Sequence, residues 1–551
     1  MHHGHGWFCL SEWQLPIDLT AIRTLNLSTM EFVMQARSLF AVSVVLMLCC
    51  SDLPSTAQNP GNPNSNPINN RPLTSSLANA QETSIGQRVF YDPDQVQTVH
   101  LKIEEVDQRR MIEALPECIY VPALFRWRDQ TVSRVGVRFK GNSSSNPNQL
   151  HKRSYLIKFS KYEKDQRFLG MERISLDNGI QFGSLFSEPI ITDILRALGQ
   201  DTHRCNYAKL YVNEDYRGVY VNVERIDESF IERHFPSPTG GLWKNDVGGP
   251  GGNLQYIGDN PEAYSKAFEA KNSRAKDEIG NLITLIQRVN RVPQNDVEQM
   301  LDQNMKVDDF LKTTAVMLFS GAFDQLTGWG PHNYYLYRAP ATEKWHYLPW
   351  DLDVGFSEVA FGRIHILEDW HAAWPVPLGV RNPLLERIIG NPALLARYRS
   401  HASDILENHF EPDRLCQIVD TKYALIREAL ATDPFPKRRA TVPGDQNYDD
   451  IVESIKQFIR KRYQTAKSQL ENPGLRPQPR QQNHGMPVQM SERLQKVTHK
   501  AEGIQRRLQQ IQQTMQQISR LLQQGKLSEA EQLIEALEQL TASETIPQPT
   551  R

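Results

Sequence analysis

Residues 323–356 constrain the fold of this chain more than any other segment. The tyrosine-rich residues 333–337 predict a strand, and the aromatic and apolar residues 344–348 predict a second strand that stops at a proline. Carboxylates stand just before the first run and just after the second. A hairpin of these strands would gather oxygen-bearing side chains at one end of a small sheet, namely Asp324, Asn333, Asp351 and Asp353.

Such a cluster of oxygens suits a hard cation. Mg²⁺ held by one or two carboxylates and by phosphates is the usual arrangement of phosphoryl-transfer sites. For each aspartate taken alone, the alternative is a turn residue that hydrogen-bonds its own backbone. However, Trp350 and Phe356 bracket Asp351 and Asp353, and acids flanked by bulky apolar groups need a partner such as a metal or a base. The pattern therefore favours a metal site.

Several further segments accompany this one in a fixed order, namely 137–144, 152–159, 210–213, 218–220, 224–227, 332–337 and 349–353. Together the set resembles the spore coat protein H (CotH) family of atypical, protein-kinase-like proteins, over roughly residues 99–470. The resemblance implies an α+β, bilobal kinase-like fold with a mostly β N-lobe and a mostly α C-lobe. It also implies ATP and Mg²⁺ as cofactors, with Mn²⁺ or Ca²⁺ as alternatives, and a protein Ser or Thr as acceptor.

The resemblance also assigns roles to residues. Asp324 would be the catalytic base, and Lys158 would hold phosphate as a second catalytic residue. Asn333 and Asp351 would bind the metal, with Asp353 as a further ligand. Asp324 departs from ordinary kinases, because no His-Arg precedes it and it lies nine residues from Asn333 rather than about five.

Two other segments are expected to bind nucleotide. Small residues let backbone N–H groups approach phosphate closely, so the loop after residue 140 would cover the phosphates through Gly141, Asn142 and Ser143. A plain hairpin turn is the alternative. Glu224 and Asp227 lie where a strand, a short connection and a helix follow one another, which is the layout of a kinase hinge. For Glu224 the alternative is a structural salt bridge.

Alternation predicts strands over 98–103, with Val99, Leu101 and Ile103 on one face, and over 154–159, with Tyr155, Ile157 and Phe159 on one face. Helices are expected over about 263–288 and over 307–322.

A helix is also expected over 187–198 from its apolar face. It occupies the place of the kinase helix whose acid pairs with the strand lysine. Glu188 is its only glutamate, but its position in the first turn favours a surface acid stabilised by the helix dipole, and Asp193 is another candidate.

The sequence predicts one central domain at 96–470, with separate segments before and after it. Residues 1–57 combine a doubtful start, with Met30 or Met34 as the better one, and a signal peptide whose apolar core at 39–50 is too short for a stable transmembrane span. Residues 58–95 predict a disordered linker. Residues 471–490 form another linker, and 491–545 predict a helical hairpin or coiled coil, the expected contact for a homo-oligomer.

Composition narrows the function further. A formal charge of −2 on 551 residues argues against a nucleic-acid binder. Three widely spaced cysteines follow the signal, Cys118, Cys205 and Cys416, and they fix neither a disulfide framework nor a zinc site. The sequence thus predicts an exported kinase of the CotH type that is secreted, periplasmic or associated with a cell surface or coat. Because ATP is scarce outside cells, the alternative is a non-catalytic structural module of the same fold that could bind Ca²⁺.

Overall fold

The computed structural model describes most of the central part of the chain. It covers residues 83–476 except 142–144, 146–151, 180–183, 329–330, 361, 363, 377–381, 436–441, 443 and 446. In the C-terminal region it describes Thr514, Gln517, Ile518, Leu521, Lys526, Glu529, Gln532 and Leu533. The predicted signal peptide lies outside these residues, as do most of the two predicted linkers and most of the predicted helical hairpin.

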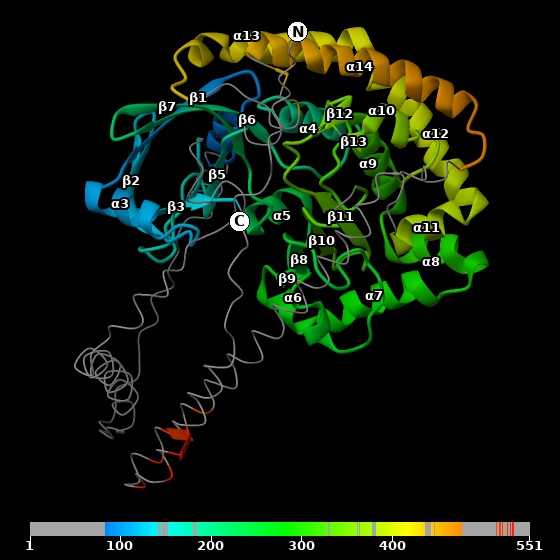
Figure 1. Cartoon of the computed structure of the whole chain (residues 1–551), viewed down its shortest axis with the longest axis horizontal. Coiled ribbons are helices and arrows are strands. Elements are labelled where there is room, and N and C mark those ends of the chain that lie inside the picture. Colours follow the sequence, from blue (N-terminus) through cyan, green and yellow to red (C-terminus); the bar gives the residue numbers. More distant parts are fainter. Residues whose placement is uncertain are drawn as a thin grey trace, which may run out of the picture. The chain divides into compact units, whose positions relative to one another are not determined.

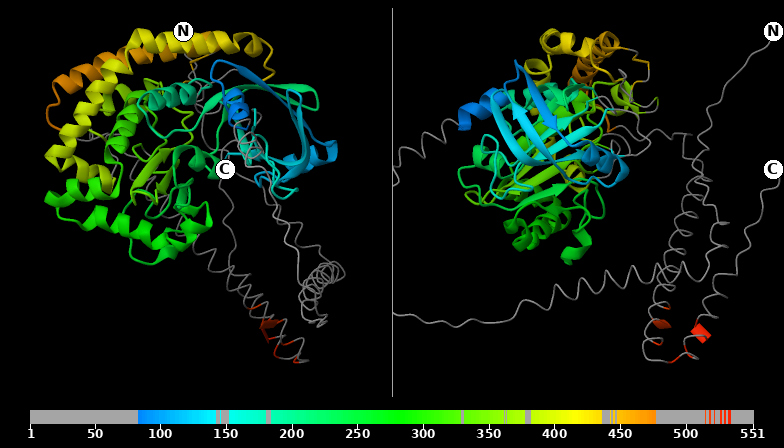
Figure 2. Two further views of the ribbon diagram at one scale, coloured as in Figure 1. Left: turned by 180° about the vertical axis from the view of Figure 1, so that it is seen from behind. Right: turned by 90° about the vertical axis from the view of Figure 1, so that its left-hand side faces the viewer.

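Seven strands close into a barrel in the order β1-β2-β3-β4-β5-β7-β6 (Figures 1 and 2). Neighbouring strands are antiparallel except β1 and β6, whose parallel pairing closes the ring. The strands are β1 (Val96–Lys102), β2 (Val121–Trp127), β3 (Gln130–Lys140), β4 (Ser154–Lys158), β5 (Arg173–Asp177), β6 (Cys205–Val212) and β7 (Asp215–Val223). Helix α3 (Glu105–Glu113) connects β1 to β2, and α4 (Ser187–Ala197) connects β5 to β6.

Alternation along the strands explains the barrel core. Successive side chains of a strand point to opposite faces, so every second residue can enter the interior. Tyr155 and Ile157 of β4 and the following Phe159 are all buried in the barrel core, as their predicted common face requires. Val99 and Leu101 of β1 are buried there in the same way. The predictions of these strands and of their inward faces are confirmed.

Residues 83–95 correct the predicted extent of the first linker. Residues 83–90 are helical, and Phe90 is fully buried against the barrel. Its ring makes edge contacts with Trp127 and Phe168, with ring centroids 5.4 and 5.1 Å apart. The burial of Phe90 could not be predicted from the sequence pattern, because a single aromatic residue among polar residues does not produce a periodic signal. The disordered linker therefore cannot extend to residue 95.

A second sheet has the strand order β11-β10-β8-β9. Its three neighbouring pairs are all antiparallel. The predicted hairpin of residues 333–348 is confirmed as β10 and β11, with Tyr334 opposite Pro349. The strands are β8 (Leu242–Asn245), β9 (Glu269–Ala270), β10 (Tyr334–Arg338) and β11 (Trp345–Pro349).

Helices make up most of the rest of the central region (Figure 1). Helix α12 packs on α9, and α14 packs on α13. The helices are α5 (Glu228–His234), α6 (Ser273–Asp277), α7 (Ile279–Arg291), α8 (Val297–Asn304), α9 (Val307–Ser320), α10 (Ile366–Asp369), α11 (Pro383–Ile389), α12 (Pro392–Asn408), α13 (Pro412–Ala431) and α14 (Tyr448–Glu471). The short helices η3 (Pro261–Tyr264) and η4 (Gln294–Asp296) and the strand pair β12 (Val359–Ala360) and β13 (Ile364–His365) complete the described elements.

The structure therefore has mixed α+β architecture. The predicted helices at 187–198 and 307–322 are confirmed as α4 and α9. A single helix expected over 263–288 is wrong, because β9 interrupts it by pairing with β8. In the C-terminal region Gln517, Ile518 and Leu521 are helical, and the helical hairpin over 491–545 stays a prediction.

Candidate functional site

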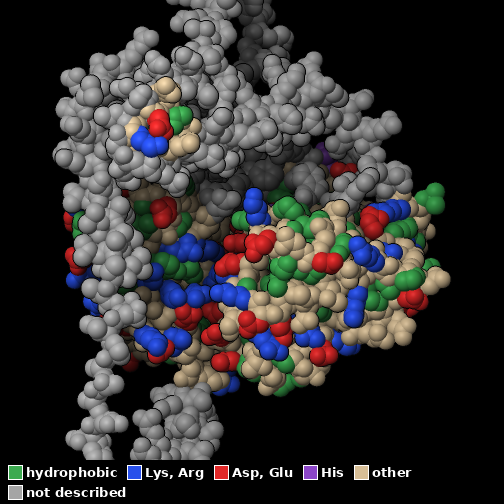
Figure 3. Space-filling model, turned by 90° about the horizontal axis from the view of Figure 1, so that it is seen from below, with side chains coloured by type: hydrophobic (Ala, Val, Ile, Leu, Met, Phe, Trp, Pro, Cys, Tyr) green, Lys and Arg blue, Asp and Glu red, His purple; other side chains and the backbone are tan. Residues whose placement is uncertain are grey.

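A cavity of about 730 Å³ lies where the barrel meets the second sheet. This volume falls in the range of small-molecule sites, roughly 300–1,000 Å³. Strands β3, β4 and β5 supply one wall, and the ends of β8, β10 and β11 supply another. Seen from below, many of the Lys and Arg side chains on the described surface gather in its left half, with acidic side chains beside them (Figure 3). The polar lining includes Arg138, Lys140, Asp177, Arg225, Lys244, Asp246, Asp324, His332, Asn333, Asp351 and Asp353.

The hairpin brings the four predicted oxygen-bearing residues into this one cavity. The Trp350 backbone N–H donates to the Asn333 carbonyl at 2.9 Å, which joins the beginning of β10 to the end of β11. Asn333 and Asp351 both have left-handed backbones, with φ of 57° and 58°. Asn and Asp tolerate this conformation better than most residues do. It turns the chain sharply at the points where these polar side chains enter the cavity.

Asp324 follows the C-terminal end of α9. Gly321 ends that helix with φ of 69°, and the chain then reaches Asp324 after two more residues. One carboxylate oxygen lies 2.9 Å from His332 Nε2. The other accepts a hydrogen bond from Asn333 Nδ2 at 3.2 Å. The carboxylate is 39% exposed, so it is oriented by two neighbours and still open to the cavity.

Asp351 and Asp353 are both half-buried in the lining of the cavity. Burial raises the pKa of the Asp351 carboxyl to about 6, with Asp177 and Glu188 adding to the rise and Lys140 opposing it. Burial also raises the pKa of Asp353 well above its ordinary value, and repulsion from Asp351 adds to this. Two carboxyls that oppose each other's ionisation in this way would be relieved by a bound cation.

The residues that line the cavity include a donor set suited to Mg²⁺. Among the described residues, no group of three or more His, Cys, Asp or Glu side chains could hold an ion unaided. The cavity offers the carboxylates of Asp351 and Asp353 and the carboxamide oxygen of Asn333. Mg²⁺ usually takes one or two protein carboxylates and completes its shell with phosphate oxygens and water. The donor set therefore fits Mg²⁺ bound together with a phosphate-bearing ligand.

Positive charge surrounds Trp350, the residue that precedes Asp351. The Arg225 guanidinium lies 4.5 Å from the centroid of its ring, and the Lys140 and Lys244 ammonium groups lie 5.9 and 5.8 Å from it. Burial lowers the pKa of Lys140, but the carboxylates of Asp177 and Asp351 outweigh burial and hold it above its ordinary value. Lys140 therefore remains charged. Its ammonium group pairs with Asp177 and that of Lys244 pairs with Asp246, so cations and carboxylates lie side by side in the cavity lining.

The structure corrects the prediction for Lys158. It lies on the same face of β4 as Ser154 and Leu156, which do line the cavity, but two residues further along the strand. Its ammonium group pairs with Glu172 at 3.0 Å, and Lys158 is absent from the cavity lining. Two residues of a strand span roughly 6.6 Å, which accounts for the displacement. Lys140, on the neighbouring strand opposite Ser154, lines the cavity.

Glu224 is a structural residue in this structure. Its carboxylate is 2% exposed and pairs with Arg204 and Arg233, each at 2.5 Å. Burial raises the pKa of Glu224, but the two arginines outweigh burial and hold it below its ordinary value. Because both of its oxygens are engaged away from the cavity lining, the prediction that Glu224 binds nucleotide is wrong, and the salt-bridge alternative is confirmed.

Asp227 also lies outside the cavity lining. It caps α5 by accepting a hydrogen bond from the Ser229 N–H at 3.3 Å. Burial raises the pKa of its carboxyl to about 6, although Arg225 and Arg173 oppose the rise. A carboxylate used as a helix cap explains this residue without a nucleotide.

Replacing Glu224 by Gln should destabilise the protein without changing its affinity for ligands of the cavity. The loss should be about 1.5–3 kcal/mol, as for a buried hydrogen bond between charged groups. Urea unfolding measures it, with Glu232→Gln on the exposed side of α5 as the matched control. An unchanged midpoint for Glu224→Gln would contradict the structural role.

Two remaining predictions concern the phosphate loop and α4. Gly141 lines the cavity, with φ of 93°, whereas Asn142 and Ser143 lie outside the described residues.

The expectation that Glu188 is a surface acid is wrong. It is 1% exposed, and its carboxylate lies 2.9 Å from Nε2 of the buried His203. The His203 ring in turn packs against Trp350, with centroids 5.2 Å apart.

Sequence reasoning missed several residues of the cavity. Most of the basic side chains in the cavity lining were not predicted as site residues, namely Lys140, Arg225, Lys244 and His332. A signal existed for Lys140, because Arg138 and Lys140 alternate with the buried Val137 and Phe139 and end directly at Gly141. Lys244 had no such signal, since its strand, β8, is short and buried throughout.

Comparison with known proteins places this cavity in a family. The CotH kinase protein family matches residues 137–466, and the chain belongs to that family. The match includes every residue named above as lining the cavity. The chain is also 22% identical over 354 residues to the inner spore coat protein H of Bacillus subtilis (strain 168), covering 64% of this chain and 91% of that protein.

Two further findings concern the described part of the chain as a whole. Cys118, Cys205 and Cys416 are free thiols, and the last two are buried. No helix in the described part of the chain is long and apolar enough to cross a membrane.

Proposed function

We propose that this protein is a Mg²⁺-dependent phosphotransferase with a bilobal, kinase-like fold. The barrel would form the N-lobe, and the second sheet with its helices would form the C-lobe. The observation that carries the proposal is one cavity whose lining combines Asp324, Asn333, Asp351 and Asp353 with Lys140 and other cations. The membership in the CotH kinase protein family supports the same activity.

The proposed chemistry assigns each residue a task. Asp351, Asp353 and Asn333 would hold Mg²⁺, which when bound would neutralise charge on the phosphates. Lys140, together with Arg225, would bind phosphate oxygens of ATP. Asp324, oriented by His332, would accept the proton of the acceptor hydroxyl.

The proposed reaction transfers the γ-phosphoryl group of ATP to the acceptor hydroxyl. The acceptor oxygen forms a bond to the γ-phosphorus of ATP while the bond from that phosphorus to the β–γ bridging oxygen breaks. The hydroxyl proton goes to Asp324, and ADP leaves. We propose a protein Ser or Thr as acceptor, on the family resemblance, and export with delivery to a surface or coat, because the relative in Bacillus subtilis is named an inner spore coat protein.

A thermal-shift experiment distinguishes the proposed enzyme from its alternatives. Ligand at 100 times its dissociation constant stabilises a protein by about 2.7 kcal/mol. ATP with Mg²⁺ should therefore raise the melting temperature by a few degrees, and ATP with EDTA should raise it much less. Stabilisation by Ca²⁺ alone, with no effect of ATP, would favour a calcium-binding module. No response to either ligand would favour a structural module.

Lys140 and Lys158 form a matched pair for testing the corrected assignment. Lys140→Met should weaken Mg-ATP binding by roughly tenfold or more, because a charged hydrogen bond contributes about 1.5–3 kcal/mol. Lys158→Met should leave the affinity unchanged, since its ammonium group pairs with Glu172 outside the cavity. Isothermal titration of both variants measures this. The reverse pattern would restore Lys158 as the phosphate ligand.

The C-terminal tail should be dispensable for nucleotide binding. Removing residues 477–551 keeps Arg476, whose guanidinium holds Glu386 at 2.7 and 2.8 Å, and removes none of the proposed ligands. Nucleotide affinity should stay the same, and the oligomer should become smaller if the predicted hairpin pairs between chains. Titration and light scattering measure the two effects. A folded truncation that lost nucleotide affinity would contradict the assignment of the site to the central domain.

A further inference from the structure

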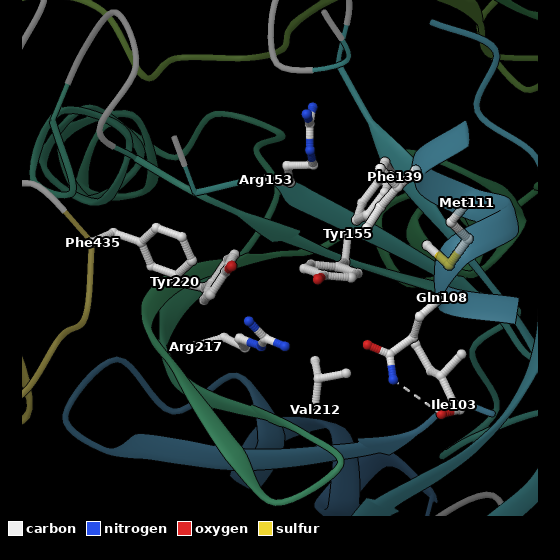
Figure 4. Close-up of a pocket in the computed structure, with 11 residues that line it drawn as sticks. Ile103, Gln108, Met111, Phe139, Arg153, Tyr155, Val212, Arg217, Tyr220 and Phe435 are labelled. Atoms are coloured by element: carbon white, nitrogen blue, oxygen red, sulfur yellow. Dashed lines mark hydrogen bonds between the residues drawn. The ribbon is translucent and has the colours of Figure 1, made fainter. Parts of the chain in front are cut away.

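The mouth of the barrel holds a second, smaller cavity of about 180 Å³ (Figure 4). Strands β3, β4, β6 and β7 contribute to it, together with Ile103 directly after β1, and α3 borders it through Gln108, Met111 and Ile112. Small ligands bind preferentially in the mouths of β-barrels, among other concave sites. Nothing in the proposed phosphotransfer uses this cavity.

The two cavities share two strands but use opposite faces of them. Lys140 of β3 and Ser154 of β4 line the larger cavity. Their neighbours Phe139 and Tyr155 line the mouth of the barrel. Because alternate residues of a strand point to opposite faces, a ligand in the mouth would not contact the acidic residues of the larger cavity.

The mouth has a buried apolar floor. Ile103, Met111, Phe139, Val212 and Tyr220 are each less than 9% exposed and form most of it. A volume of about 180 Å³ corresponds to about six water molecules at roughly 30 Å³ each. The space suits the body of a single ring or a short branched chain rather than a nucleotide.

Arg217 gives this apolar space a positive charge. Figure 4 shows its guanidinium directed into the space bounded by Tyr155, Val212 and Tyr220. Its Nε is buried and has no hydrogen-bond partner among the described residues. Among the described residues, Arg217 forms one ion pair, in which its Nη2 lies 3.8 Å from Asp215 Oδ2. The Asp215 side chain is 76% exposed. A solvated pair of this kind contributes little.

Within the described part of the chain, the other charges near the mouth do not neutralise Arg217. None of the described lining residues is acidic. Asp433, which lies close enough to Tyr220 to affect its titration, is engaged by the Lys152 ammonium group at 2.7 Å and by the Val219 N–H at 3.0 Å. Arg153 adds a second positive charge at the rim, with its guanidinium carbon 5.4 Å from the centroid of the Phe139 ring.

From this arrangement we propose that the mouth of the barrel binds a small carboxylate with a compact apolar body, such as an aromatic acid. The carboxylate would accept hydrogen bonds from the Arg217 guanidinium, and the ring would lie against Phe139, Tyr155 and Val212. Arginine is suited to this task because its planar group matches a carboxylate. The site is independent of the proposed kinase activity.

Isothermal titration of the full chain with benzoate tests the proposal, with benzamide as the neutral probe of the same shape. Benzoate should bind at least about tenfold more tightly than benzamide, because a charged hydrogen bond contributes about 1.5–3 kcal/mol. Arg217→Gln should remove this preference. Arg109→Gln is the matched control, since Arg109 is an arginine of α3 that is 63% exposed and does not line the cavity.

A second variant guards against an effect on folding. Ile112 lines the mouth and is 57% exposed, so its replacement should not disturb the core. Ile112→Glu should weaken benzoate binding several-fold by repulsion, and Ile112→Gln should weaken it less. Absence of benzoate binding, equal binding of benzamide, or full binding by Arg217→Gln would each overturn the proposal. Asp351→Ala should weaken Mg-ATP binding and leave benzoate binding intact. A failed benzoate titration would therefore count against the site in the mouth and not against the proposed phosphotransferase site.

Discussion

Replacing Asp351 by Ala should weaken Mg-dependent ATP binding by about 10²-fold or more. Loss of a group that only supports a metal ligand already costs roughly 10–100-fold in metal affinity, and Asp351 is proposed as a ligand itself. ATP binding without Mg²⁺ should change much less. Isothermal titration with and without EDTA measures both quantities.

Asp404→Ala is the matched control for this variant, because Asp404 is an exposed aspartate on α12 far from the cavity lining. Asp351→Ala should remain folded, since removing one of several clustered carboxyls relieves repulsion in the site. Equal Mg-ATP affinities for Asp351→Ala and the parent would show that the metal assignment is wrong.

Replacing Asp324 by Ala should spare Mg-ATP binding and slow phosphoryl transfer by about 10²–10⁴-fold, the usual cost of losing a general base. The reason is its position: the carboxylate is 39% exposed and held by His332 and Asn333, so it is open to an incoming hydroxyl. A transfer assay at saturating ATP measures the rate.

Asp324→Asn refines the test. It can keep contacts with His332 and Asn333 but cannot accept the proton, so it should be as slow as Asp324→Ala. Transfer at the parental rate in either variant would remove Asp324 from the mechanism. Weakened ATP binding with an unchanged rate at saturation would instead make Asp324 a binding residue.

Local patterns in the sequence predicted the elements that carry the site. The alternation of Tyr155, Ile157 and Phe159 placed one face of β4 in the barrel, and the aromatic runs at 333–348 predicted the hairpin. Both patterns work because the period of a strand is a local property of the chain. The expected meeting of Asp324 with Asn333 followed from the same hairpin, and the structure places both in one cavity.

Properties that depend on distant residues were harder to predict. Alternation indicates the face on which Lys158 lies but not how far along the strand the cavity extends, so Lys140 was missed. Glu224 is explained by Arg204 and Arg233, neither of which is adjacent to it in sequence. Burial of Glu188 likewise depends on His203, which the chain brings back only after α4 has ended.

A crystal structure of the protein with Mg²⁺ and a non-hydrolysable ATP analogue tests the central claim most directly. The account predicts Mg²⁺ on Asp351 with Asn333 or Asp353, phosphate oxygens within hydrogen-bond distance of Lys140, and the γ-phosphate facing Asp324. Phosphates bound at Lys158 and Glu172, or a cavity that stays free of nucleotide at saturating concentration, would contradict it.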